Sequence, residues 1–170
     1  MSEELIEVRP ELMGIQSTGY AGAFPPQVAR RVGQIVSHPV LHLFSGTSRL
    51  GDERVDWDRP EATINMDVLA FVKQDSRDWK FVVADPPYEL YRADEKLSQY
   101  ASKVAVSASV PLRTAIESYL RAHAENVIWF DYCIPPFRGF DIKQTWLYRP
   151  MGWAKIRALT WMTRKGERLA

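Results

Sequence analysis

Residues 81–88 read Phe-Val-Val-Ala-Asp-Pro-Pro-Tyr, and this stretch decides the fold class of the chain. Its first four residues are all apolar, as in a strand that is buried on both faces. Asp85, Pro86 and Pro87 follow at once and end the strand, because proline has no N–H group to donate to a sheet. The sequence therefore predicts a buried strand at residues 81–84 whose carboxyl end carries a carboxylate in a rigid turn.

Other strand-like and helix-like segments alternate along the chain. Predicted strands lie at residues 40–44, 54–57, 62–66 and 127–130, and predicted helices at residues 26–36, around 97–104 and at 112–120. The aromatic- and Thr-rich segments 144–149 and 157–164 flank a turn at Pro150-Met151-Gly152 and predict a closing antiparallel hairpin. This alternation predicts an α/β fold with a mostly parallel sheet, in which ligands bind at the carboxyl ends of the strands.

Two links between predicted strands are short for a fold of this kind. Only four residues separate Trp57 from Ala62, whereas a crossover between parallel strands needs about a dozen residues. The link from Phe44 to Arg54 is also short. We therefore expect a reduced complement of helices, with some sheet surface left poorly covered.

The bulk composition is that of an ordinary globular domain. The chain has 170 residues, of which 46% are hydrophobic and 25% are charged. Its apolar runs fall short of the roughly 18 residues of a membrane span, and its first residues are acidic, unlike a signal peptide. Cys133 is the single cysteine, which excludes an internal disulfide, and we expect it to be buried. The sequence predicts a cytoplasmic protein with one domain at residues 24–170 after a loose arm at residues 1–23, and no membrane partner.

Charge is unevenly distributed along the chain. Residues 138–170 contain eight Lys or Arg and two acidic residues, which gives +6, while the whole chain carries +1. The remaining residues therefore carry 1 − 6 = −5. A basic segment of this kind either binds phosphate groups or forms a solvated face.

The sequence Asp85-Pro86-Pro87-Tyr88, directly after an apolar strand, resembles the catalytic motif of amino-methyltransferases that act on nucleic acid bases. The resemblance implies a Rossmann-like class I methyltransferase fold and S-adenosyl-L-methionine as the cofactor, with no metal. The Asp85 carboxylate and the Pro86 carbonyl would accept hydrogen bonds from the target amino group, and Pro87 would help to fix that carbonyl. Tyr88 would stack on a base taken out of the duplex.

Residues 42–51, His-Leu-Phe-Ser-Gly-Thr-Ser-Arg-Leu-Gly, resemble the cofactor loop of the same enzymes. Gly46 lies 39 residues before Asp85, in the order that the family shows, and glycine lets the backbone approach the methionine part of the cofactor. The family usually has an acidic residue where His42 stands and often a second glycine where Ser48 stands. The cofactor contacts that the resemblance implies here are Phe44, Ser45, Gly46, Thr47 and Ser48.

The stretch Ala23-Phe24-Pro25-Pro26 resembles the aromatic-proline element that precedes the cofactor loop in many DNA amino-methyltransferases. The resemblance implies that Phe24 helps to enclose the methionine end of the cofactor. The alternative is a hydrophobic staple onto the helix that follows.

Two further strand ends resemble cofactor-binding positions of this family. At residues 54–57 the resemblance implies that Asp56, or its neighbour Asp58, binds the ribose hydroxyls and that Trp57 lies against the adenine ring. At residues 64–67 it implies that Asp67 meets the adenine amino group. Each acid has the alternative of being a plain surface carboxylate.

Residues 134–140 leave the strand at 127–130 toward the presumed active edge. Phe137 and Arg138 in this segment are candidates for binding the substrate as a wall of the target-base pocket. The alternative is a packed loop.

The combined motifs predict an S-adenosylmethionine-dependent methyltransferase that acts on an exocyclic amino group, with N6 of adenine in DNA as the first choice. An RNA base methyltransferase is the alternative among enzymes, and a cofactor-binding, non-catalytic subunit of a methyltransferase complex is the alternative from another class. A protein-glutamine methyltransferase is disfavoured, because that family usually has Asn where Asp85 stands. Nucleic acid is the expected partner, and the poorly covered sheet leads us to expect a homodimer.

Overall fold

The computed structural model describes residues 8–12, 24–87, 109–149 and 156–166. Tyr88, the predicted helix around residues 97–104 and the predicted turn at residues 150–152 lie outside the described residues.

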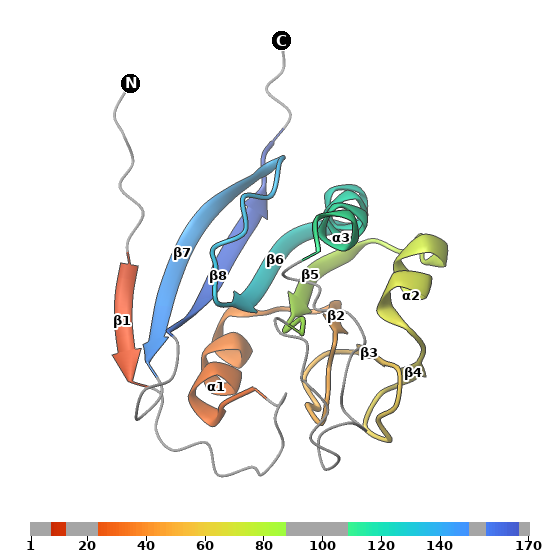
Figure 1. The fold of residues 1–170 in the computed structure, drawn as a ribbon, viewed down its shortest axis with the longest axis horizontal. Helices are drawn as coiled ribbons and strands as arrows, with labels where there is room; N and C mark the ends of the chain where they lie inside the picture. Colours follow the sequence, from red (N-terminus) through yellow and green to blue (C-terminus); the bar gives the residue numbers. More distant parts are fainter. Residues whose placement is uncertain (1–7, 13–23, 88–108, 150–155, 167–170) are drawn as a thin grey trace.

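Eight strands form one sheet in the order β1-β7-β8-β6-β5-β2-β3-β4, which runs from left to right in Figure 1. The strands are β1 (Val8–Leu12), β2 (Val40–Leu43), β3 (Glu53–Asp56), β4 (Ile64–Asn65), β5 (Trp79–Ala84), β6 (Ala124–Asp131), β7 (Phe140–Arg149) and β8 (Arg157–Arg164). Strand β8 is antiparallel to both of its neighbours, and every other adjacent pair is parallel. The prediction of an α/β fold with a mostly parallel sheet and a closing antiparallel hairpin is confirmed.

In the described part of the chain, three helices pack on this sheet: α1 (Pro26–Ile35), α2 (Val68–Gln74) and α3 (Val110–His123). Helix α1 begins with a proline, whose missing N–H would have no partner in the first turn of a helix. Its buried Val28 and Val32 join Phe81 and Val83 of β5 in one apolar cluster. Apolar residues of α2 and α3 form a second cluster with the β5 residues that alternate with Phe81 and Val83, such as Val82. Because side chains alternate along a strand, the two clusters lie on opposite faces of the sheet.

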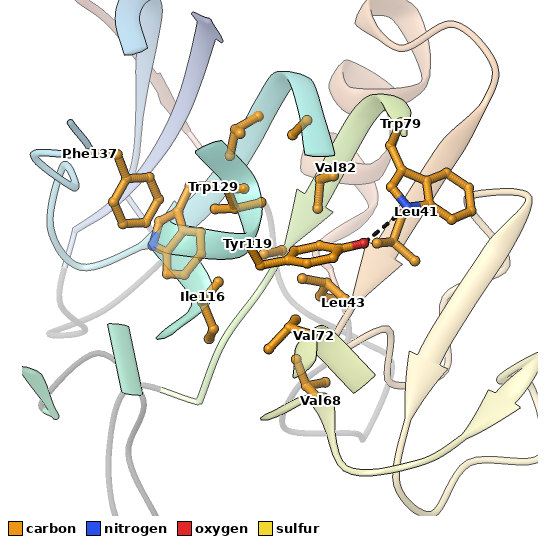
Figure 2. Close-up of a cluster of buried hydrophobic side chains, with 14 of the residues drawn as sticks. Leu41, Leu43, Val68, Val72, Trp79, Val82, Ile116, Tyr119, Trp129 and Phe137 are labelled. Atoms are coloured by element: carbon orange, nitrogen blue, oxygen red, sulfur yellow. Dashed lines mark hydrogen bonds between the residues drawn. The ribbon is translucent and has the colours of Figure 1, made fainter. Parts of the chain in front are cut away.

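Figure 2 shows the cluster under α2 and α3, with Tyr119 of α3 reaching Trp79 at the start of β5. The indole N–H of Trp79 donates to the Tyr119 hydroxyl over 3.0 Å, and that hydroxyl donates to Oδ2 of Asp75 over 2.6 Å. Arg77 completes the group with a 2.6 Å hydrogen bond to Oδ1 of Asp75. The polar groups of the buried Trp79 and Tyr119 therefore both have partners, and these hydrogen bonds join α3 to the link between α2 and β5.

The short links between β2, β3 and β4 can connect parallel strands because these strands are themselves short. Nine residues connect β2 to β3 and seven connect β3 to β4, and β4 itself has two residues. Two residues of strand span about 7 Å, so the chain returns to the start of the sheet without a helix. No helix lies between β2 and β4 in the described residues, which agrees with the predicted reduction in helices. A helix does follow β4: α2, which the sequence analysis did not predict.

Residues 8–12, assigned by sequence to a loose arm, form the edge strand β1 instead. This strand pairs in parallel with β7, with Val8 opposite Thr145 and Leu12 opposite Arg149. The apolar pattern of the segment is weak because it contains Arg9, Pro10 and Glu11. Its strand conformation depends on hydrogen bonds to the free edge of β7, and a proline is tolerated in an edge strand.

Candidate active site

The strand order reverses between the neighbouring strands β2 and β5. From β2 the chain continues to β3 and β4 on one side, and after α2 it enters β5 on the other side. Leu43 at the end of β2 pairs with Ala84 at the end of β5, so the two strand ends are level. In open α/β sheets ligands bind outside the carboxyl ends of the strands at such a reversal. In Figure 1 the arrowheads of β1, β7, β6 and β5 all point to this carboxyl edge, at the bottom of the view.

The turn after β5 begins in the protein interior. Val82, Val83 and Ala84 are fully buried, and Asp85 is only 8% exposed. Pro86 is also buried, whereas Pro87 is half-buried. The predicted catalytic residues Asp85, Pro86 and Pro87 therefore stand at the sheet reversal in an environment from which water is largely excluded.

The loop after β2 turns sharply beside that position. Phe44 and Gly46 have positive φ angles of 57° and 54°. Among the described residues, Phe44 is the only residue other than glycine with a positive φ angle. A non-glycine residue held at positive φ is rare, and such strain concentrates at functional sites. The N–H of Ser48 donates to the carbonyl of Ser45 over 2.9 Å and closes the turn. Thr47 between them is half-buried.

The same loop is fastened to β3. The N–H of Ser45 donates to the Val55 carbonyl over 3.2 Å, and the N–H of Gly46 donates to Oδ2 of Asp56 over 2.9 Å. Ser45 is 2% exposed, and its hydroxyl oxygen has no hydrogen-bond partner among the described residues. The structure thus brings the predicted glycine turn into direct contact with Asp56, the residue predicted to bind the ribose hydroxyls.

His42 is buried within β2 beneath Phe24, whose ring stacks on the imidazole with centroids 5.1 Å apart. Burial lowers the pKa of His42 to about 4, with the nearby Arg54 charge adding to the effect and a hydrogen bond to Leu50 opposing it. His42 is therefore neutral at pH 7. Since Nδ1 lies 3.2 Å from the Leu50 carbonyl, Nδ1 carries the proton. The stacking places Phe24 against the strand that leads into the loop, and its predicted contact with the cofactor stays a prediction.

The remaining predicted cofactor residues lie at the ends of β3 and β4. Trp57, directly after β3, is 59% exposed, and Asp58 beside it is exposed. Asp67 follows β4 and caps α2, because its Oδ1 accepts from the N–H groups of Leu69 and Ala70, each over 3.0 Å. This cap gives Asp67 a structural role that the sequence analysis did not predict.

Phe137 and Arg138 lie in the link between β6 and β7, and their predicted role in binding the substrate stays a prediction. Phe137 is 7% exposed and packs edge-on against Trp129 at 4.9 Å, within the cluster under α2 and α3. Arg138 is exposed, and its backbone N–H donates to the Glu117 side chain of α3 over 2.8 Å. Gly139 next to it pairs with Lys165, at the edge of the sheet opposite Asp85.

Two residues at the end of β6 were missed or misjudged from sequence. Asp131 is 1% exposed, and its carboxylate accepts from the Trp129 indole over 3.2 Å and from the Tyr132 N–H over 2.6 Å. An acid directly after an apolar run, as at Asp85, is the signal that could have identified it. Cys133, expected to be buried, is exposed, because it lies in the bend after the strand ends.

No group of three or more metal-binding side chains occurs among the described residues. No helix in the same part of the chain is both long and apolar enough to cross a membrane.

The chain matches no family model and no curated protein. Among solved structures it is similar to the crystal structure of a "putative RNA methyltransferase" from Pyrococcus horikoshii. The two share 13% sequence identity at a TM-score of 0.49, over 84% of this chain and 80% of the other. No family is assigned to the chain on this likeness.

Proposed function

We propose that the chain is an S-adenosylmethionine-dependent methyltransferase of the Rossmann-like class I fold that methylates an exocyclic amino group, N6 of adenine in DNA. The observation that carries the proposal is the level pairing of Leu43 with Ala84. Because of this pairing, the turn at Gly46 and the turn at Asp85 follow the ends of adjacent strands at the reversal of the sheet, and neighbouring strands lie about 4.8 Å apart.

The strand order supports this class of fold. Read from the other edge, the sheet runs β4-β3-β2-β5-β6. With β2 as the first strand of the unit, this is the order 3-2-1-4-5 of doubly wound sheets, whose ligands lie across the reversal. One side of the reversal then holds the cofactor and the other the group that is methylated.

The residues beside β2 suit the cofactor. Gly46 at positive φ leaves room for a ligand to approach the backbone, since it has no Cβ atom. Asp56 offers a carboxylate to ribose hydroxyls from the next strand end, and the exposed indole of Trp57 offers a flat apolar face to adenine. The cofactor supplies a methyl group on a positively charged sulfur, which is a good leaving group.

The turn after β5 suits the amino nitrogen that accepts the methyl group. This nitrogen is a poor nucleophile while its lone pair is delocalised into the base. Hydrogen bonds from its two hydrogens to the Asp85 carboxylate and the Pro86 carbonyl favour a pyramidal nitrogen with an available lone pair. The nitrogen would then bond to the methyl carbon as the carbon–sulfur bond breaks, S-adenosylhomocysteine would leave, and the methylated nitrogen would pass one proton to solvent. Because Asp85 is buried, these interactions are stronger than they would be in water.

A transfer assay with radiolabelled S-adenosylmethionine tests the proposal against its alternatives. We expect label in DNA that contains adenine, and none when Asp85→Ala replaces the wild type. If only RNA became labelled, the substrate would be RNA and not DNA. Binding of S-adenosylhomocysteine without transfer to any substrate would favour a non-catalytic subunit, and failure to bind it would contradict the methyltransferase assignment.

A further inference from the structure

The charged residues at the carboxyl edge of the sheet follow a spatial order that the sequence hides. Along the strand order, β7 ends at Arg149, β8 begins at Arg157, β6 ends at Asp131, and β5 is followed by Asp85. Because β8 is antiparallel, its first residue lies at the same edge as the last residues of its neighbours. Two arginines therefore stand on one side of Asp85, at strand ends from which the expected cofactor loop is absent.

Exposed apolar side chains lie beside these arginines. After β6 come Tyr132 and Ile134, which are 37% and 42% exposed, with the exposed Cys133 between them. Before β8 comes Ile156, which is 53% exposed. Asp131 pairs with Ala158, so the residues just after β6 and just before β8 adjoin each other at this edge. We call Tyr132, Ile134, Arg149, Ile156 and Arg157 the β6–β8 rim.

We propose that the β6–β8 rim binds the strand of nucleic acid that carries the target base, with Arg149 and Arg157 on its phosphates and Tyr132 stacked on a base. This inference rests on the proposed function and assigns the substrate side of the same site. Arginines beside an exposed aromatic ring match the chemistry of single-stranded nucleic acid, whose phosphates are anionic and whose bases present flat faces.

Two contacts hold the rim in shape. The Asp131 carboxylate accepts from the Tyr132 N–H over 2.6 Å, which fixes the backbone that carries the ring. The Arg157 guanidinium lies over the Phe130 ring, 4.9 Å from its centroid. The rim groups nearest Asp85 therefore have their positions set before a ligand arrives, which lowers the entropic cost of binding.

Two other basic residues of the described segment do not compete for this role. Arg164 donates from Nε to the Ala124 carbonyl over 2.8 Å, and Lys165 lies 3.3 Å from Asp141. Both residues are at the end of β8, which is the edge opposite Asp85.

Cys133 provides a direct footprint of the rim, because it is the single cysteine of the chain and it is exposed. The probe is an oligodeoxyadenylate of roughly 16 residues, the upper site size of single-strand-binding folds. The readout is the rate at which a maleimide alkylates Cys133 at mildly alkaline pH, since burial and Asp131 raise the thiol pKa. At an oligonucleotide concentration about ten times its Kd, we expect alkylation to slow about tenfold.

The matched control moves the thiol to the opposite edge in the double variant Cys133→Ser/Gly166→Cys. Gly166 has open space where a Cβ atom would stand, so the new side chain fits. We expect the oligonucleotide to leave alkylation at position 166 unchanged. Protection at 166 without protection at 133 would overturn the inference, as would protection at neither position.

Binding measured by fluorescence anisotropy separates the roles of the rim residues. Tyr132→Ala should weaken oligonucleotide binding about tenfold, and Tyr132→Phe should restore it because the stacking face remains. Arg149→Glu should reduce the slope of log Kd against log salt by about 0.7 or more, whereas Lys165→Glu should not. An equal reduction of the salt slope in the Arg149→Glu and Lys165→Glu variants would show that the phosphates do not bind specifically at the β6–β8 rim. Calorimetry with S-adenosylhomocysteine is run on the same samples, so that a failed methyltransferase assignment is distinguished from a failed rim.

Discussion

The N–H of Gly46 lies 2.9 Å from Oδ2 of Asp56, and this hydrogen bond fastens the turn after β2 to the end of β3. One carboxylate therefore has two tasks in the proposed site. It holds the glycine turn, and it stands where ribose hydroxyls are expected. The two tasks can be separated by substitution, because an amide can accept a hydrogen bond but carries no charge.

Asp56→Ala should weaken S-adenosylhomocysteine binding by at least about 1 kcal/mol, since charge-assisted hydrogen bonds are lost and the turn is released. Asp56→Asn should weaken it less, because the amide oxygen can still accept from Gly46. Isothermal titration calorimetry measures both. Asp58→Ala is the control and should change the affinity by less than about 0.5 kcal/mol. A larger effect at Asp58 than at Asp56 would make Asp58 the ribose ligand.

His42 should make the stability of the protein depend on pH between 6.5 and about 4. Its pKa is lowered from 6.5 to about 4, so the unfolded chain binds more protons than the folded one in this range. The full contribution to stability is therefore present above pH 6.5 and is lost as the pH falls toward 4. Up to about 3 kcal/mol of unfolding free energy is at stake, which urea unfolding at a series of pH values can measure.

Substitution separates His42 from the other titrating groups. His42→Asn should flatten the pH dependence between 6.5 and 5, because no imidazole remains to be protonated. Retention of the full pH dependence in His42→Asn would show that another group causes it. Asp52 and Asp75 have lowered pKa values and are protonated only in more acidic solution.

Arg164→Ala should lower the free energy of unfolding by about 1 kcal/mol without a specific effect on nucleic acid binding. Its guanidinium donates to the carbonyls of Ala124 and Ala122 at the carboxyl end of α3, where a positive charge is favourable. The neighbouring Lys165→Ala is the control, because its ion pair with Asp141 is exposed and should contribute little. A change in oligonucleotide affinity without a change in stability would contradict this assignment.

The local pattern of the sequence predicted the centre of the sheet well. The runs 40–44, 81–84 and 127–130 are apolar at nearly every position, because these strands are covered on both faces. Their ends were recognisable from glycine and proline, which interrupt strand hydrogen bonding.

The peripheral elements could not be predicted in the same way. Strand β1 depends on the free edge of β7, which lies more than a hundred residues away in the sequence. Helix α2 has only seven residues, which is too short for a clear helical pattern in the sequence. Because the helix is not predicted, the sequence interprets the Asp67 carboxylate as a ligand group and not as the cap of a helix. The sequence shows the basic C-terminal segment only as one run of positive charge. Because β7 and β8 are antiparallel, the arginines of this segment lie at two opposite edges of the sheet.

The measurement that tests the central claim most directly is methyl transfer from S-adenosylmethionine to adenine-containing DNA, read as N6-methyladenine by mass spectrometry of the digested product. The wild-type protein should produce it, and Asp85→Ala should reduce it at least about a hundredfold, since general acid–base and electrostatic groups contribute roughly that much. The same variant should bind S-adenosylhomocysteine with nearly unchanged affinity, because in the proposed site Asp85 contacts the amine and not the cofactor. Retention of most of the transfer activity by Asp85→Ala would contradict the account.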